Sequence, residues 1–163
     1  MGTLLRLTDL AAGDAVRLPA EETLFRVLEG PGSWLSALEV DGEGQPDNGS
    51  AWFQEIFAAP DARPLADSAR YLFKIEIDVH DDVDLDAFHE WYNGTHVPEV
   101  NPAGLLGGRR FRALSHERRF LATYDLAHRH VMESDALARV RGFAQFTDGV
   151  TIRHRSILER TSR

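Results

Sequence analysis

One short segment of the chain concentrates residue types that can move protons. It begins at Phe88 with the sequence FHEWYNGTHVPEV, which places two histidines among aromatic side chains. Residues spaced i, i+3, i+4 and i+7 share one face of a helix, and the polar residues with this spacing are His89, Tyr92, Asn93 and His96. Imidazole gains or loses a proton near neutral pH. The segment therefore predicts a catalytic site in which His96 is the general acid or base and Tyr92 assists it.

The position of His96 near a helix end favours this hypothesis. Gly94 and Pro98 interrupt the helix, so regular packing is expected to end where His96 lies. Side chains at the edge of an apolar helix stripe line whatever gap remains between the helix and its sheet. That apolar stripe consists of Phe88, Trp91 and Thr95. The alternative is a histidine that only caps or packs the end of the helix.

Further polar side chains are candidates for holding a substrate near His96. Glu99 could orient the imidazole or raise its pKa, and Arg110 could hold a carboxylate or an enolate. Tyr124 and His154 could add hydrogen bonds. We expect the substrate to be a small, oxygenated and partly apolar molecule.

The same residues do not predict a metal site. His89 and His96 are two helical turns apart, about 10.5 Å along the axis, which is too far for both to bind one ion. The chain has no cysteine, which excludes disulfides, thiolate nucleophiles and cysteine metal sites. The sequence also lacks a phosphate-binding loop, a nucleophile elbow and a dinucleotide fingerprint. We expect neither a metal nor another cofactor.

The second half of the chain predicts the elements that would position this site. Residues 71–79 alternate apolar and charged side chains, which is typical of a strand with one buried face. In a barrel made from two sheets, Lys74 and Glu76 could lie on an internal or interfacial face, where they would need partners, but an exposed, ion-paired face is the simpler interpretation. A helix follows from Leu85. The later elements are strands over Arg109–Leu114 and Arg119–Leu126, a helix over Ser134–Phe146 and a strand over Val150–Leu158. This βαββαβ order over residues 70–160 is that of the ferredoxin-like unit, with both helices on one face of a four-stranded sheet.

Residues 1–66 are predicted to be an N-terminal extension or a degenerate copy of that unit. Residues 23–35 can be aligned with residues 95–107, which indicates a faint internal repeat or a chance match. The expected elements are strands over Leu4–Leu10, Trp34–Val40 and Ala51–Ala58 and a short helix over Pro19–Leu28. A lone ferredoxin-like sheet leaves one apolar face uncovered, and a second sheet is its usual cover. We therefore expect an α+β protein whose α/β barrel closes either in a homodimer or between two halves of one chain, as a pseudo-dimer.

Charge and composition exclude several classes of partner. The formal net charge is −8, whereas nucleic-acid binding needs a basic face. No run of apolar residues is long enough to cross a bilayer. Together with the absence of cysteine, this predicts a cytoplasmic protein that acts on a small molecule and binds neither nucleic acid nor membranes.

The segment FHEWYNGTHVPEV, with GLLGGRRFR and RFLATYDL downstream, resembles the EthD-like branch of the dimeric α/β-barrel proteins. That branch has the pattern E-W-Y-x-x-x-H-[IV]-P-[ED], followed by G-[FL]-x-x-x-R-R-[FY], and the resemblance covers residues 71–159. It places Trp91 and Tyr92 at the aromatic pair of the family and His96 at its histidine. It implies a site between sheet and helices that this histidine faces, and it adds Trp91 to the substrate-binding candidates. The chain departs from the pattern at Asn93, where an acidic residue often follows the tyrosine.

The resemblance does not select one reaction, because fold is a poor guide to chemistry. Relatives include muconolactone-type isomerases, polyketide cyclases, cofactor-free monooxygenases and haem-degrading enzymes. Our leading hypothesis is a cofactor-free enzyme of isomerase, cyclase or lyase type that uses His96 as acid or base. The alternatives are a non-catalytic binding or accessory protein of a biosynthetic or catabolic pathway, and a monooxygenase-type member of the same superfamily.

Overall fold

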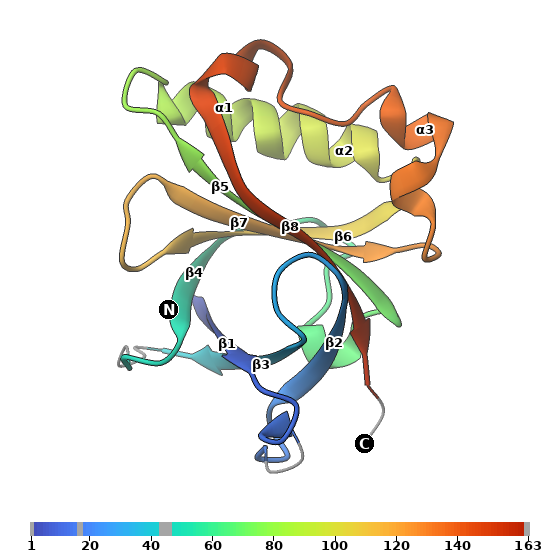
Figure 1. The fold of residues 1–163 in the computed structure, drawn as a ribbon. Coiled ribbons are helices and arrows are strands. Elements are labelled where there is room, and N and C mark those ends of the chain that lie inside the picture. The colour runs from blue at the N-terminus through green and yellow to red at the C-terminus, as the bar shows by residue number, and fades with distance from the viewer. Residues whose placement is uncertain (1, 16–17, 43–46, 162–163) are drawn as a thin grey trace.

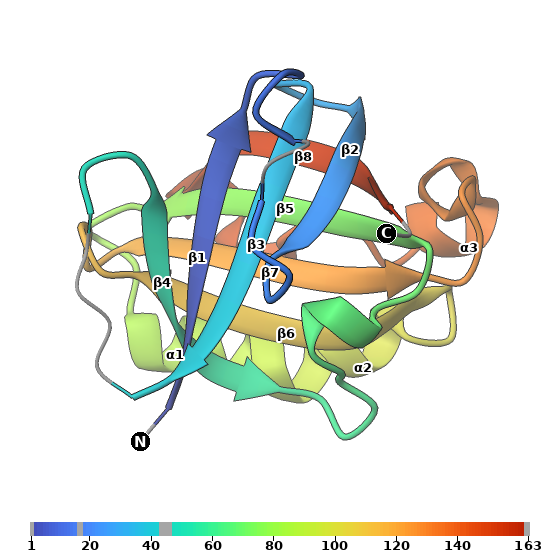
Figure 2. The ribbon, with the colours of Figure 1, turned by 90° about the horizontal axis from the view of Figure 1, so that it is seen from below.

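The computed structural model describes residues 2–15, 18–42 and 47–161. Within these residues, eight antiparallel strands form one closed barrel (Figures 1 and 2). In chain order the strands are β1 (Thr3–Leu10), β2 (Thr23–Glu29), β3 (Trp34–Asp41), β4 (Ala51–Ala58), β5 (Tyr71–Val79), β6 (Leu105–Ala113), β7 (Arg119–Leu126) and β8 (Val150–Arg160). Around the barrel the order is β1-β3-β2-β8-β5-β7-β6-β4, and β4 pairs with β1. The barrel therefore closes within a single chain.

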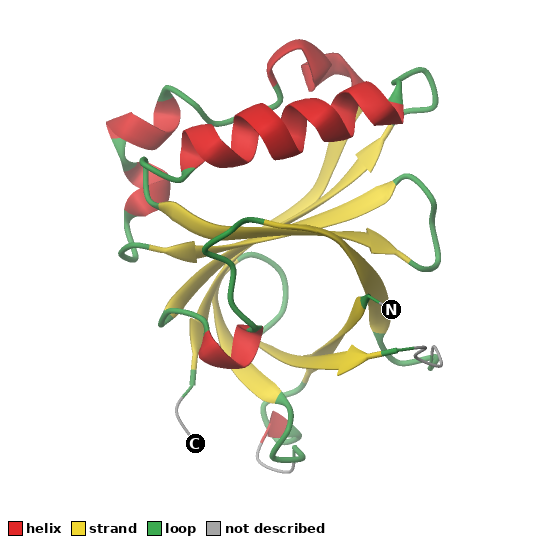
Figure 3. Cartoon of the chain, turned by 180° about the vertical axis from the view of Figure 1, so that it is seen from behind, coloured by secondary structure: helices red, strands yellow, loops and turns green. Residues whose placement is uncertain are grey.

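The main helices lie on one side of the barrel, over the outer face of strands β5 to β8 (Figures 1 and 3). α1 (Leu85–Trp91), a π-helical turn (Tyr92–His96) and α2 (Val97–Val100) follow one another as a single rod. The remaining helical segments are α3 (Asp135–Ala138) and 3₁₀ turns at Leu65–Asp67, Val131–Glu133 and Ala144–Gly149. No helix in the described part of the chain is long and apolar enough to span a lipid bilayer.

The βαββαβ order predicted for residues 70–160 is found, but its second helix is much shorter than predicted. The expected helix over Ser134–Phe146 is wrong, because α3 ends at Ala138. Beyond it, Gly142 (φ +100°) and Ala144 (φ +47°) adopt left-handed backbone conformations, which interrupt a continuous α-helix. This irregular stretch crosses the sheet beside α2 (Figure 1).

The first half of the chain contributes four strands without a covering helix. Their order, β4-β1-β3-β2, is the same as the order β8-β5-β7-β6 in the second half. The predicted helix over Pro19–Leu28 is wrong, because β2 occupies Thr23–Glu29 and buries Phe25 completely inside the barrel. The alignment of residues 23–35 with residues 95–107 sets β2 against α2 rather than against a strand, so a degenerate repeat stays a prediction.

Two apolar cores share the sheet of strands β5 to β8. One lies between this sheet and the helices and includes Phe73 and Ile75, and the other fills the barrel and includes Leu72. Successive residues of a strand point to opposite faces, so Lys74 and Glu76 point into the barrel. Their exposed fractions are 7% and 9%. The expectation of an exposed face at these residues is wrong, because the face is the inner wall of a barrel that β1 to β4 complete.

The turn between β2 and β3 depends on a glycine packed against β8. Gly30 has φ +108°, and a Cβ atom there would lie 2.4 Å from the carbonyl oxygen of Arg155. We expect Gly30→Ala to lower the free energy of unfolding by about 2–4 kcal/mol, as backbone strain and overpacking add. Urea denaturation measures this. Gly42→Ala is the matched control, because Gly42 has φ +111° with nothing within 4 Å of its Cβ position; an equal loss in both variants would contradict the packing argument.

Candidate active site

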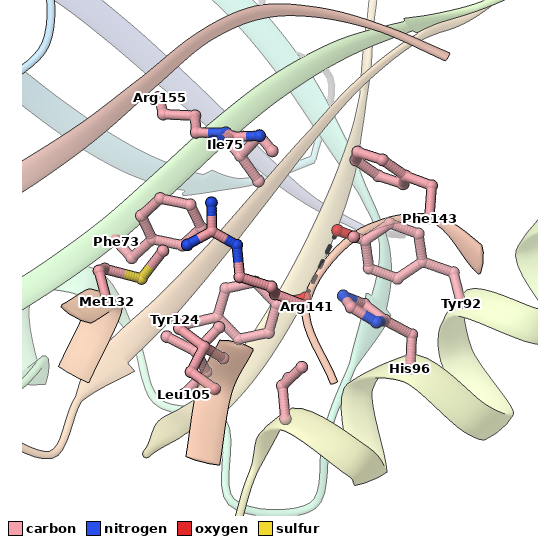
Figure 4. Close-up of a pocket in the computed structure, with 13 residues that line it drawn as sticks. Phe73, Ile75, Tyr92, His96, Leu105, Tyr124, Met132, Arg141, Phe143 and Arg155 are labelled. Carbon is pink, nitrogen blue, oxygen red and sulfur yellow. Dashed lines mark hydrogen bonds between the residues drawn. The ribbon is translucent and has the colours of Figure 1, made fainter. Parts of the chain in front are cut away.

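A small cavity lies between the helical rod and the outer face of the sheet (Figure 4). Its volume is about 60 Å³, well below the roughly 300–1,000 Å³ of common ligand pockets. Most of its wall is apolar and comes from β5, β6, the helices and the irregular stretch after α3. The lining residues are Phe73, Ile75, Tyr92, His96, Val100, Leu105, Tyr124, Met132, Leu137, Arg141, Gly142, Phe143 and Arg155.

The π-helical turn is what directs both Tyr92 and His96 into this cavity. The N–H of Val97 donates to the carbonyl of Tyr92, five residues back, in place of the usual four. A π turn of this kind changes the phase of a helix and is frequent at functional sites. The turn therefore divides the polar stripe that a regular helix would align: Tyr92 and His96 line the cavity, whereas His89 and Asn93 contact Arg110.

His96 is a buried, neutral imidazole with a free nitrogen. Its exposed fraction is 7%, and its ring stacks on Trp91 at a centroid distance of 5.0 Å. Burial, and then the positive charge of Arg110, lower the pKa of His96 to about 4. Its Nδ1 atom has no hydrogen-bond partner among the described residues. Because a buried polar atom without a partner is costly, this nitrogen is available to a ligand in the cavity.

Two tyrosine hydroxyl groups stand opposite the imidazole. The Tyr124 hydroxyl donates to the Tyr92 hydroxyl at 3.4 Å, and the dashed line in Figure 4 marks this bond. Burial raises the pKa of Tyr92 and raises the pKa of Tyr124 still further above its ordinary value. Both tyrosines are therefore protonated at neutral pH, and the Tyr92 hydroxyl keeps its own proton for a ligand. A neutral base and a hydrogen-bond donor face the same small space.

Arg110 lies behind the site rather than in it. It is 1% exposed, and its guanidinium carbon is 3.9 Å from the centre of the Tyr92 ring, on the side away from the cavity lining. One guanidinium nitrogen donates to Asn93 Oδ1 at 2.9 Å and to His89 Nδ1 at 3.0 Å, and another has no partner among the residues that the structure describes. Arg110 does not line the cavity, so its direct contact with a substrate stays a prediction. Arg110 instead places an uncompensated positive charge beneath Tyr92.

The other predicted binding residues are distributed over three places. Trp91 supports the ring of His96 by stacking. Glu99 is exposed on α2 and does not line the cavity, so it does not orient His96. His154 points into the barrel, on the opposite face of the sheet, where it contacts Glu76 and Lys74. Its expected association with His96 fails because alternate residues of β8 face opposite sides.

Some residues of the cavity had no sequence signal. Met132 lies in the 3₁₀ turn before α3, outside every predicted element, and Arg141 lies where a regular helix was expected, so that the backbone turns after α3 bring it to the cavity. Arg141 and Arg155 are both exposed at its edge, and Figure 4 shows their guanidinium groups extending across it. They give the entrance a positive charge.

Comparison with known proteins identifies the architecture. No protein-family model matches the sequence, and no curated protein is similar to it. Among solved structures, an uncharacterized ferredoxin-fold protein from Listeria monocytogenes related to antibiotic biosynthesis monooxygenases has a TM-score of 0.67 at 11% identity, over 99% of this chain and 96% of that chain. The chain has the fold of that protein. A major regulator of staphylococcal pathogenesis gives a TM-score of 0.67 at 15% identity, over 98% of this chain and 99% of that chain.

A haem-degrading enzyme from Listeria monocytogenes also shares the fold, with a TM-score of 0.58 at 12% identity over 98% of this chain and 99% of that chain. At these identities the likeness establishes the ferredoxin-like fold alone, and membership of the EthD-like branch stays a prediction. Haem itself does not fit the site. His96 offers a ligand nitrogen, but a cavity of about 60 Å³ has no room for a porphyrin, and Trp91 and Tyr92 pack against the faces and edge of the imidazole.

Proposed function

We propose that this protein is a monooxygenase-type enzyme that needs no organic cofactor and oxidises a small, enolisable carbonyl or phenolic compound at His96. The observation that carries the proposal is the buried imidazole of His96, which burial keeps neutral and which lines a cavity together with Tyr92; its Nδ1 atom has no hydrogen-bond partner among the described residues. The monooxygenase relationship of the Listeria protein that shares this fold favours oxidation over isomerase, cyclase or lyase chemistry.

The chemistry begins with proton transfer to His96. The imidazole takes a proton from an acidic C–H or O–H group, and the Tyr92 hydroxyl donates to the oxygen on which negative charge develops. The positive charge of Arg110 favours this negative charge, because its guanidinium carbon lies 3.9 Å from the centre of the Tyr92 ring. Although the free imidazole is a weak base, the anion formed beside it stabilises the imidazolium in this dry environment.

The anion then supplies the electrons for O₂. In the balanced reaction R₂CH₂ + O₂ → R₂C=O + H₂O, one oxygen atom enters the substrate, the other leaves as water, and the substrate provides all the electrons. The cavity size limits the reacting part of the substrate to a few heavy atoms. The guanidinium groups of Arg141 and Arg155 at the entrance suit a substrate that carries oxygen atoms or negative charge at its outer end.

Acetylacetone is a suitable first probe, because it is small and its central C–H group is acidic. An oxygen electrode measures turnover, and hydrogen–deuterium exchange at the central carbon under nitrogen measures proton abstraction alone. We expect both rates to exceed those of buffer. Exchange without O₂ uptake would instead indicate isomerase or lyase chemistry at the same base, and saturable binding without exchange would indicate a binding protein.

Phe143 closes one wall of the cavity and controls the size of the substrate. It is 8% exposed and lies between two left-handed backbone positions, Gly142 and Ala144. We expect Phe143→Ala to enlarge the cavity and to shift preference toward bulkier 1,3-diketones, with kcat/KM for a phenyl-substituted diketone rising about tenfold relative to acetylacetone. Ile152→Ala removes an exposed apolar side chain elsewhere and is the control. An unchanged preference in Phe143→Ala would show that this side chain does not bound the substrate.

A further inference from the structure

A second and larger cavity lies inside the barrel, on the opposite face of β5 from His96. Its volume is about 320 Å³, which is within the range of small-molecule pockets. Leucine, valine and phenylalanine side chains form the apolar part of its wall, and the exposed residues Asp9, Pro31 and Gly49 form its rim. The cavity therefore opens at one end of the barrel and becomes apolar toward the inside.

Three polar side chains meet on the wall of this cavity. Lys74 Nζ lies 3.3 Å from Nδ1 of His154, and Nε2 of the same imidazole contacts a carboxylate oxygen of Glu76. Glu76 also faces Arg153, with a nitrogen–oxygen distance of 3.9 Å. The Nε2 atom of His154 therefore donates to Glu76, and Nδ1 is left as an acceptor for the lysine. A nucleophile, a base and a carboxylate that orients the base stand in line, which is the arrangement of an activated nucleophile.

Lys74 is the single lysine among the 18 lysine and arginine residues of the chain. The residue is 7% exposed and, in the described part of the chain, its amine forms no ion pair with a carboxylate. Burial lowers the pKa of Lys74, and the more distant charges of Glu76 and Asp9 only partly oppose this. An arginine would remain protonated at this position and could not act as a nucleophile. A lysine in a desolvated pocket beside a base can lose its proton and act as a nucleophile.

We propose that the barrel cavity is a second site, in which Lys74 binds a small uncharged aldehyde or ketone as a Schiff base. This inference is independent of the function proposed for His96, since the two cavities share no lining residue. In the reaction, the Nζ lone pair attacks the carbonyl carbon and a C–N bond forms. The C–O bond then breaks, and the oxygen leaves as water with the two hydrogens of the amine. His154 transfers one of these protons, and Glu76 holds the imidazole in place.

The lining indicates which carbonyl compounds this site takes. The carboxylates of Glu76 and Asp9 share the lining with the apolar side chains of Leu35, Phe53 and Leu158. A carbonyl compound with a negative charge would meet these carboxylates, whereas one with a short alkyl chain would occupy the apolar part. The class of ligand is therefore a short, uncharged aliphatic aldehyde or ketone.

Reductive trapping tests the proposal directly, because the chain has only two kinds of amine. The native protein is treated with propanal and sodium cyanoborohydride at about pH 7, and peptide mass spectrometry compares propylation of Lys74 with that of the α-amino group. An ordinary lysine has a pKa of about 10.4 and an α-amine about 7.7–8.0, so an ordinary lysine reacts roughly a hundredfold more slowly. In the native protein, we expect the rate of propylation of Lys74 to lie within about tenfold of that of the α-amino group. In protein unfolded by guanidinium, we expect Lys74 to be propylated more slowly than the α-amino group.

Two further measurements test the proton transfer by His154 and the class of ligand. His154→Gln is expected to lower native labelling of Lys74 by about tenfold or more, whereas His80→Gln, which replaces an exposed histidine near the end of β5, should leave it unchanged. Glyoxylate, normalised to the α-amine, should label Lys74 less than propanal does. Labelling of Lys74 that is no faster in the native than in the unfolded protein would overturn the proposal. This comparison uses only the unsubstituted protein, so it does not depend on the folding of a variant.

Discussion

His96→Ala is expected to lower O₂ uptake and anaerobic deuterium exchange with acetylacetone by about 10²–10⁴-fold, the usual contribution of a positioned general base. Both rates should fall together, because proton abstraction precedes the reaction with O₂. Added imidazole should restore part of the exchange, since the substitution leaves space beside Trp91 where the ring of His96 stacks. Rescue of this kind separates loss of the base from loss of packing.

His128→Ala is the matched control for this variant. His128 is exposed after β7 and does not line either cavity, so its removal should leave both rates within experimental error. Thermal unfolding of the two variants reports whether His96→Ala keeps the fold. Full turnover in a folded His96→Ala protein would contradict the assignment of His96 as the base, whatever the substrate proves to be.

Acidification from pH 7 to pH 5 is expected to destabilise the protein by about 2 kcal/mol through His96, and by less through His89, which is partly exposed and therefore screened by solvent. The pKa values of His89 and His96 are both lowered to about 4, chiefly by burial and next by the charge of Arg110. In the unfolded chain an imidazole has a pKa of about 6.5. Between these values the unfolded state binds more protons than the folded state, so stability is complete above about pH 6.5 and is lost as the pH falls toward 4.

Urea denaturation at the two pH values measures this effect. His96→Gln should remove more than half of the pH dependence that the two histidines cause, because glutamine does not titrate and His89 contributes less, and His128→Gln, at an exposed position, is the control. The pH range avoids titration of Glu76 and Asp78, whose pKa values are lowered further below the usual carboxyl range. A pH dependence in His96→Gln equal to that of the parent protein would show that His96 is not held neutral by burial.

Local sequence patterns predicted the second half of the fold because they report local physics. The alternation at residues 71–79 and the stripe that includes Trp91 follow from the periods of a strand and a helix, and β5 and α1 occur there. Asp84 caps α1 by accepting from two backbone N–H groups. The same patterns failed at residues 19–28 and 134–146, where an acidic turn and an apolar period favour helix. Pairing of β2 with both β3 and β8 overrides that preference in the first case, and left-handed backbone positions do so in the second.

The residues of the candidate site also fall into those that the sequence predicted and those that only the tertiary structure brings together. Residue types and spacing were enough to single out Tyr92 and His96, since few other positions combine an imidazole with aromatic neighbours at a helix end. Which side chains join them was not encoded locally: His89 contacts Arg110 and does not line the cavity, and the alternation of β8 places His154 inside the barrel. Long-range strand pairing decides on which side of a sheet a residue lies, and it cannot be deduced from neighbours in the chain. For this reason the closure of the barrel around Lys74 became visible only in three dimensions.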